Sequence, residues 1–123
     1  MIIYKKGNIL ESKAEALVNN VNTQGVMGKG IALQFKNAFP SNYKIYQDIC
    51  KNGSFQIGDL LIVEENGLIS GKKTIINFPT KTSWRKPSEY SYIEKGLEKL
   101  VQVIEEKKLN SIAIPPLGSG NGG

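Results

Sequence analysis

Hydrophobic and polar positions change their spacing several times along the chain, and each spacing predicts a different element. Short runs rich in β-branched or other apolar residues predict strands at residues 2–4, 16–21, 59–65, 74–78 and 111–114. Between these runs, apolar positions recur at helical intervals, which predicts helices that begin at residues 31, 41 and 87. Strands that alternate with helices imply an α/β fold with a largely parallel sheet covered on both faces.

Proline, serine and glycine mark the predicted helix boundaries. Pro40 ends the first helix, Ser41 is predicted to cap the second, and Gly53 lies just past its end. The third helix is predicted to start at Pro87 and Ser88. Its apolar stripe is predicted to consist of Ile93, Leu97, Leu100, Val101 and Ile104.

Two weaker signals concern short features. Ser12 and Glu15 stand at capping-box spacing, which predicts a helical turn starting at Ser12. Pro79 is predicted to close the strand at residues 74–78, because proline cannot donate to the hydrogen-bond ladder of a sheet.

Composition narrows the class of protein and the kinds of site. The chain has 123 residues, of which 40% are apolar and 22% charged, as is typical of one globular domain. It contains no histidine, which excludes histidine-based triads and most zinc sites, and we expect neither a metal nor a cofactor. The single cysteine, Cys50, favours a reducing, cytoplasmic compartment. No apolar run indicates a membrane span or a signal peptide.

The net charge of +5 is unevenly distributed. Between Gly67 and Ser88 there is no acidic residue, and Trp84 lies among the basic side chains of that segment. Such a segment suits phosphates and unstacked bases, although a solvated, lysine-rich surface would have the same composition. The basic residues are Lys72, Lys73, Lys81, Arg85 and Lys86.

Three polar or glycine-rich stretches follow predicted strands, at residues 19–30, 79–86 and 118–123. Ligands of open parallel sheets bind at the carboxyl ends of the strands, and glycine loops turn backbone N–H groups toward anions. Two such loops would suit a diphosphate, but they could also be ordinary turns. Neither standard nucleotide motif is present. A P-loop needs serine or threonine after Gly28-Lys29, where this chain has Gly30, and the glycines at residues 25, 28 and 30 do not have the G-x-G-x-x-G spacing of a dinucleotide-binding loop.

Groups able to perform catalysis are few. Lys81 is the one lysine that comes directly after a predicted strand end, in a loop expected to border the pocket. A lysine with a lowered pKa can attack a sugar aldehyde or donate a proton, whereas an ordinary lysine only adds surface charge. The residues alone leave both interpretations open.

Five segments carry a recognisable pattern, at residues 7–10, 16–23, 25–32, 77–81 and 114–123. The most specific are the run from Gly25 to Phe35 and the NFPTK block at residues 77–81, which is followed by Trp84 and Arg85. In this order the segments resemble the macrodomain family, and more narrowly its DarG-like branch. The resemblance implies a three-layer α/β/α fold with a mixed, largely parallel sheet and a cleft for ADP-ribose. It also implies one macrodomain over residues 1–123, truncated at its C-terminus because the family continues with another helix and strand.

The resemblance implies roles for individual residues. Asn8 stands where typical members have an aspartate that accepts a hydrogen bond from adenine, and Ile9 lies beside it. Asn22 would hold the distal ribose. The other contacts to ADP-ribose would come from two phosphate loops and a strand end, namely Gly28, Lys29, Gly30, Ile31, Thr80, Ser119, Gly120, Asn121 and Gly122.

The same resemblance assigns catalysis to Lys81, which would attack the anomeric carbon of the opened distal ribose. Related members place an assisting aspartate about where this chain has Gly122, so the general acid or base is unassigned. Trp84, Arg85 and Lys86 would contact the nucleic acid.

The expected function is therefore that of an ADP-ribosyl glycohydrolase, which removes ADP-ribose from thymine bases of single-stranded DNA as the antitoxin of a DarT-type toxin. The expected partners are the ADP-ribose moiety, the modified DNA and that toxin. Two alternatives are kept, namely a module that binds ADP-ribose without turnover and a hydrolase acting on ADP-ribosylated protein carboxylates.

Overall fold

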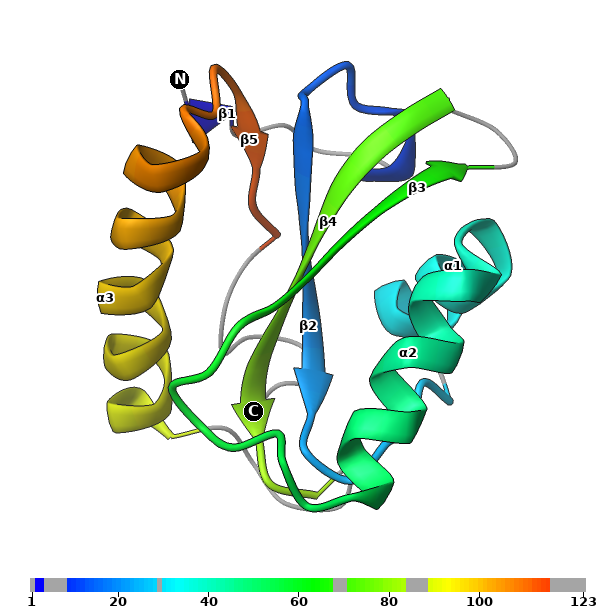
Figure 1. Cartoon of the computed structure of the whole chain (residues 1–123), viewed down its shortest axis with the longest axis vertical. Coiled ribbons are helices and arrows are strands. Elements are labelled where there is room, and N and C mark those ends of the chain that lie inside the picture. Colours follow the sequence, from blue (N-terminus) through cyan, green and yellow to red (C-terminus); the bar gives the residue numbers. More distant parts are fainter. Residues whose placement is uncertain (1, 4–8, 29, 68–70, 84–88, 116–123) are drawn as a thin grey trace.

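The computed structural model describes residues 2–3, 9–28, 30–67, 71–83 and 89–115. Helix α3 covers one face of a central sheet, and α1 with α2 covers the other, so the predicted three-layer α/β architecture is confirmed (Figure 1). The elements are β1 (Ile2–Ile3), the 3-10 turn η1 (Ile9–Glu11), β2 (Ala16–Asn22), α1 (Gly30–Ala38), α2 (Pro40–Lys51), β3 (Leu61–Gly67), β4 (Gly71–Lys81), α3 (Tyr90–Lys107) and β5 (Ile112–Ala113).

The sheet is mixed and largely parallel, as predicted. Its strand order is β1-β5-β2-β4-β3, and β4 pairs antiparallel with β3 while the other neighbours pair parallel. Strands β2 and β4 lie inside the sheet and end at the same edge (Figure 1). Because loops after parallel strands meet at one edge, this pair positions the residues discussed below.

Alternating residues of β2 supply the core on both faces of the sheet. Leu17 packs toward α1 with Phe35 and Phe39, whereas Val18 lies on the α3 face with Phe78. Burial of apolar side chains on two faces explains why β2 reads as a nearly continuous apolar run. A third cluster, near the carboxyl end of β2, contains Val21, Met27, Tyr46 and Phe55.

Helix α2 begins one residue earlier than predicted and is capped differently. Pro40 is the first residue of α2, Phe39 occupies the cap position, and no side chain of the cap makes a hydrogen bond. The predicted cap at Ser41 is therefore wrong. Instead, the backbone N–H groups of Ser41 and Asn42 donate to the carboxylate of Glu65 on β3, at 3.1 and 2.7 Å. A carboxylate at a helix N-terminus satisfies free N–H groups and interacts favourably with the helix dipole.

The predicted helical turn at Ser12 is also wrong. The helical residues precede it in η1, and the chain from Ser12 to Ala14 has no regular structure. The Ser12 hydroxyl accepts a hydrogen bond from the N–H of Ala14 at 3.1 Å, which is a local bond that competes with a helix. The buried Lys73 ammonium holds this bend by donating to the carbonyls of Ser12 and Ala14.

Strand β4 continues through Pro79 to Lys81, so the prediction that Pro79 closes it is wrong. The pairing of β4 with β3 ends at Asn77, and beyond that point β2 is the one neighbour of β4 among the described strands. Proline is tolerated there because one side of β4 has become a sheet edge.

The buried stripe of α3 is rotated from the predicted one. Gly96, Leu100 and Val103 are buried, whereas Leu97 and Val101 are 39% and 56% exposed. The start predicted at Pro87 and Ser88 lies outside the described residues, and the helix is seen from Tyr90. Gly96 faces the sheet because its backbone lies against Phe78, and a Cβ there would overlap the ring.

We predict that Gly96→Ala lowers the melting temperature. Alanine in a helix interior normally stabilises a protein by about 1 kcal/mol over glycine, but here the methyl group overlaps the fully buried Phe78 ring, with an expected net cost of about 1–3 kcal/mol. Val101→Ala on the exposed face of α3 is the control and should change stability little. A melting temperature of Gly96→Ala at or above that of the wild type would contradict this packing.

We also predict that Glu65→Ala destabilises the fold by about 0.5–2 kcal/mol, the usual cost of losing a helix cap. The reason is that two N–H groups of α2 lose their acceptor. Denaturant unfolding would measure the loss. The adjacent Glu64→Ala removes an exposed carboxylate of the same strand and serves as the control. Equal unfolding midpoints for the two variants would argue against capping by Glu65.

Candidate functional site

The carboxyl ends of β2 and β4 bring Asn22 and Lys81 side by side. The two residues are register partners in the parallel pair, although they are far apart in the sequence. Just before them the register shifts, since Val21 pairs with Pro79 and Asn22 pairs with Lys81. Thr80 is the extra residue in this irregularity and is buried. Such bulges are common next to active sites because they redirect side chains at the end of a strand.

The segments that follow the two strands are tied together. The backbone N–H of Thr23 donates to the carbonyl of Lys81 at 3.0 Å, and its hydroxyl donates to the carbonyl of Thr82 at 3.2 Å. One residue further along, Ser83 donates to the side-chain oxygen of Gln24 at 3.2 Å. The backbone at the half-buried Lys81 is therefore held in place by the loop that follows β2.

The side chain of Asn22 organises that loop. Its Oδ1 accepts hydrogen bonds from the backbone N–H groups of Gln24, Gly25 and Val26, at 3.0, 3.0 and 3.3 Å. Its Nδ2 donates to the carbonyl of Val26 at 2.9 Å. Asparagine favours such turns because its short amide can replace a backbone partner. The N–H groups of residues 24–26 are thus used by Asn22, which leaves phosphate contacts to the residues that follow.

Helix α2 supports the same loop from below. The buried Tyr46 hydroxyl donates toward the backbone carbonyl and Oδ1 of Asn22, both at 2.8 Å. Gly25 has a φ of +95°, and a Cβ at this position would lie 3.2 Å from Cβ of Cys50. The loop therefore requires glycine here both for its backbone conformation and for its close approach to α2.

Burial keeps both titratable groups beneath the loop protonated. It raises the pKa of Tyr46 well above its ordinary value, so the hydroxyl remains a hydrogen-bond donor. It also raises the pKa of Cys50 to about 11, although the hydrogen bond to Tyr46 opposes this shift. Because the thiolate is the reactive form, Cys50 has the character of a structural residue and not of a nucleophile.

The predicted first phosphate loop lies at the start of α1. Gly28 is exposed, and Gly30 is the first residue of the helix, with a φ of +66°. The half-buried Ile31 packs on the core cluster of α1, as does Ile9 of η1. An exposed glycine before a helix N-terminus leaves room for an anion near its N–H groups.

Several predicted site residues lie outside the part of the chain that the structure describes. The described residues bring together Asn22, Lys81 and the bulged Thr80, and Gly28 and Gly30 follow the loop that Asn22 organises, at the start of α1. The predicted residues outside the described part are Asn8, Lys29, Trp84, Arg85, Lys86, Ser119, Gly120, Asn121 and Gly122.

Two basic residues of the segment between Gly67 and Ser88 lie far from the candidate site. Lys72 and Lys73 lie near the start of β4 and Lys81 at its end, about 30 Å apart along an extended strand (Figure 1). Lys73 is only 7% exposed and donates to backbone carbonyls, so it has a structural role. Arg85 and Lys86 belong to the segment that is not described.

Sequence reasoning missed two residues of this edge. Tyr46 appears in the sequence only as one apolar position of a helix, and Thr23 only as a polar residue after a strand. The hydroxyl of Tyr46 reaches a residue 24 positions away, and that of Thr23 a residue 59 positions away. No local pattern signals such contacts.

The described segments contain neither a metal-binding cluster nor a membrane-spanning helix. In these segments, no group of three or more histidine, cysteine, aspartate or glutamate residues is arranged to hold a metal ion. None of the helices seen in them is both long and apolar enough to cross a membrane.

The chain is similar to characterised proteins along its whole length. It is 53% identical over 123 residues to the DNA ADP-ribosyl glycohydrolase of Thermus aquaticus, and this match covers 100% of the chain and 34% of that relative. It is 52% identical to the DNA ADP-ribosyl glycohydrolase of Mycobacterium tuberculosis, with 100% and 35% covered. The chain thus spans about a third of the length of these curated relatives.

Solved structures share the fold. The macrodomain of Mycobacterium tuberculosis DarG superposes with a TM-score of 0.92 at 52% identity, over 100% of this chain and 80% of that one. Thermosipho africanus DarTG in complex with ADP-ribose superposes with a TM-score of 0.86 at 33% identity, over 95% of this chain and 33% of that one. The family model described as Macro domain matches residues 18–123. The sequence, the three-layer fold and these matches agree, and the chain belongs to the Macro domain family.

Proposed function

We propose that this chain is the catalytic macrodomain of a DNA ADP-ribosyl glycohydrolase. It would cleave the N-glycosidic bond between ADP-ribose and thymine in single-stranded DNA. Support comes from the 52–53% identity, over the full chain, to relatives that bear this name. The observation that carries the proposal is the parallel pairing that places Lys81 beside Asn22.

The proposed partners follow from the same similarity. A similar structure is a DarTG protein in complex with ADP-ribose, and another relative is a fusion of a DNA ADP-ribosyl transferase with a DNA ADP-ribosyl glycohydrolase. We therefore propose that this protein reverses the action of a DarT-type toxin on DNA in the cytoplasm. ADP-ribose would occupy the edge between Asn22 and Gly30, with its phosphates near the start of α1.

Lys81 is the proposed nucleophile. Its amine attacks the anomeric carbon of the distal ribose, and the carbon–nitrogen bond to thymine breaks as the base nitrogen takes the electron pair and a proton. The resulting adduct opens to an imine between the sugar and Lys81. Water then hydrolyses the imine, which releases ADP-ribose and restores the amine. The hydrogen bonds from Thr23 would hold this backbone in place while the Lys81 amine first bonds to the sugar and is then released by water.

We predict that Lys81→Ala lowers the rate of DNA de-modification by about 10²–10⁴-fold, the range typical of a lost catalytic group. The assay measures thymine-linked ADP-ribose remaining on an ADP-ribosylated oligonucleotide. Lys72→Ala is the matched control, because it removes an exposed lysine from the opposite end of the same strand. Equal release of ADP-ribose by Lys81→Ala and the wild type would overturn the role of Lys81.

We further predict that a hydride donor such as cyanoborohydride traps the imine on the wild type during turnover. Intact mass spectrometry should then show ADP-ribose attached to the protein, and Lys81→Arg should give no adduct. Turnover without a trapped adduct would indicate instead that Lys81 donates a proton to the departing base.

A reader module without turnover is the second candidate, and one observation favours it. Gly122 stands about where related members have an assisting aspartate, so the chain has no assigned general acid or base. Calorimetry with ADP-ribose beside the turnover assay separates the two functions, since a reader binds tightly but releases no product. Parallel assays with ADP-ribosylated protein would identify a hydrolase that prefers modified carboxylates.

A further inference from the structure

We propose that Tyr46 is a positioning residue for the ADP-ribose site, because its hydroxyl holds the Asn22 carboxamide in a single orientation. This inference rests on the proposed function. Tyr46 lies on α2, beneath the loop, and its hydroxyl oxygen is 2.8 Å from both the backbone oxygen and Oδ1 of Asn22. Tyr46 would act on the ligand only through Asn22.

The surroundings of Asn22 determine which end of its amide faces the ligand. Three backbone N–H groups and the Tyr46 hydroxyl all donate toward Oδ1, at 2.8–3.3 Å. If the amide were flipped, Nδ2 would face these donors and the bonds would be lost. The carbonyl end of Asn22 is thus saturated by the protein. A carboxamide nitrogen has two hydrogens, and Val26 accepts one of them.

The consequence is a chemical preference at this position. Asn22 can offer a ligand one N–H group of Nδ2 but no further acceptor capacity. It therefore recognises an acceptor, such as a ribose hydroxyl oxygen. An aspartate in its place could not donate to Val26 and would repel the acceptors of the ligand.

Tyr46 is suited to this task because both its ring and its helix are held in place. Its ring is fully buried and packs edge-on against Phe55, with centroids 6.2 Å apart and planes at 87°. Its helix is joined to the sheet by a pair of buried amides, since Asn42 and Asn77 donate to each other at 3.1 and 2.7 Å. The hydroxyl therefore sits on a rigid support, which is what an oriented ligand-binding amide requires.

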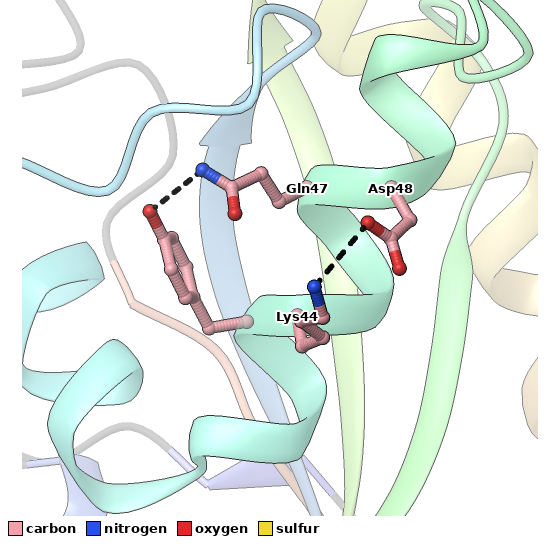
Figure 2. A network of polar contacts seen from close by, with 4 residues as sticks. Lys44, Gln47 and Asp48 are labelled. Carbon is pink, nitrogen blue, oxygen red and sulfur yellow. Dashed lines mark hydrogen bonds and ion pairs between the residues drawn. The ribbon is translucent and has the colours of Figure 1, made fainter.

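The test compares Tyr46→Phe with Tyr43→Phe on the same helix. The Tyr43 hydroxyl accepts a hydrogen bond from Gln47 of the same helix at 3.0 Å, so this bond stays within α2. Figure 2 shows Gln47 beside the Lys44–Asp48 ion pair of that helix. Each variant removes one hydroxyl and keeps the ring. For Tyr46→Phe we expect ADP-ribose binding by calorimetry to weaken about tenfold, the size of one lost hydrogen bond, and KM to rise similarly. kcat should stay within about twofold, because Tyr46 would act on the ligand only through Asn22. Tyr43→Phe should behave as the wild type in both assays.

A folded Tyr46→Phe that binds ADP-ribose as tightly as the wild type would overturn the inference. An equal fall in kcat and binding would also overturn it, since that result indicates general damage to the site. A spectroscopic readout is independent of the ligand. The side-chain amide signals of Asn22 should shift in the NMR spectrum of Tyr46→Phe and stay in place in Tyr43→Phe.

Hydrogen exchange on the wild type keeps the inference testable if Tyr46→Phe fails to fold. The backbone amides of Gln24 and Gly25 should exchange slowly, because Asn22 accepts both. Rapid exchange at both amides would contradict the hydrogen bonds from these amides to Asn22. Failure of the wild type to bind ADP-ribose would instead refute the proposed function, while the exchange and NMR results would still report on how Asn22 is held.

Discussion

Parallel pairing between β2 and β4 is the constraint on which the site depends. The pairing brings the last residues of two distant segments to one edge and makes Asn22 and Lys81 neighbours. The bulge at Thr80 alters the register just before that point, so the ends of both strands leave the regular pleat together. Thr23 then continues the connection beyond the sheet through its bonds to residues 81 and 82. A shift of one strand along the other would separate the proposed nucleophile from the amide beside it.

The interior between this sheet and α2 is more polar than an ordinary core. Asn77 of β4 bonds Asn42 of α2, and Asn19 of β2 donates to the same Asn77 oxygen at 3.4 Å. Buried amides are costly unless they are paired, so they specify one arrangement of helix and sheet instead of many. Glu65 contributes in the same direction by capping α2 from β3. Helix α2 is thereby oriented as a support for the ligand loop and not only as a cover for the sheet.

Most elements could be predicted because their apolar spacing is local. The run from Ala16 to Val21 and the helical repeats of α1, α2 and α3 have the predicted type. The order of elements led to a largely parallel α/β sheet, and the resemblance to macrodomains added that the sheet is mixed. The errors share one cause. The predictions at Ser41, Ser12 and Pro79 rested on local signals alone. Glu65, Lys73 and the end of β3 supply partners or free an edge that the local sequence does not reveal. Gly96, for its part, replaces Leu97 in the core because Phe78 occupies the space above the sheet.

The candidate site divides in the same way. The stretches at residues 19–30 and 79–86 could be found because polar residues and glycines follow predicted strands there, and Lys81 was one candidate among them. The roles of Asn22, Gly28 and Gly30 came from the resemblance to the macrodomain family. Only the folded molecule shows how the Asn22 amide is oriented and that the Tyr46 hydroxyl bonds it. The same is true of the hydrogen bonds by which Thr23 holds the backbone at Lys81. Hydrogen bonds between residues 24 and 59 positions apart depend on the packing of whole elements, and no spacing along the chain encodes that packing.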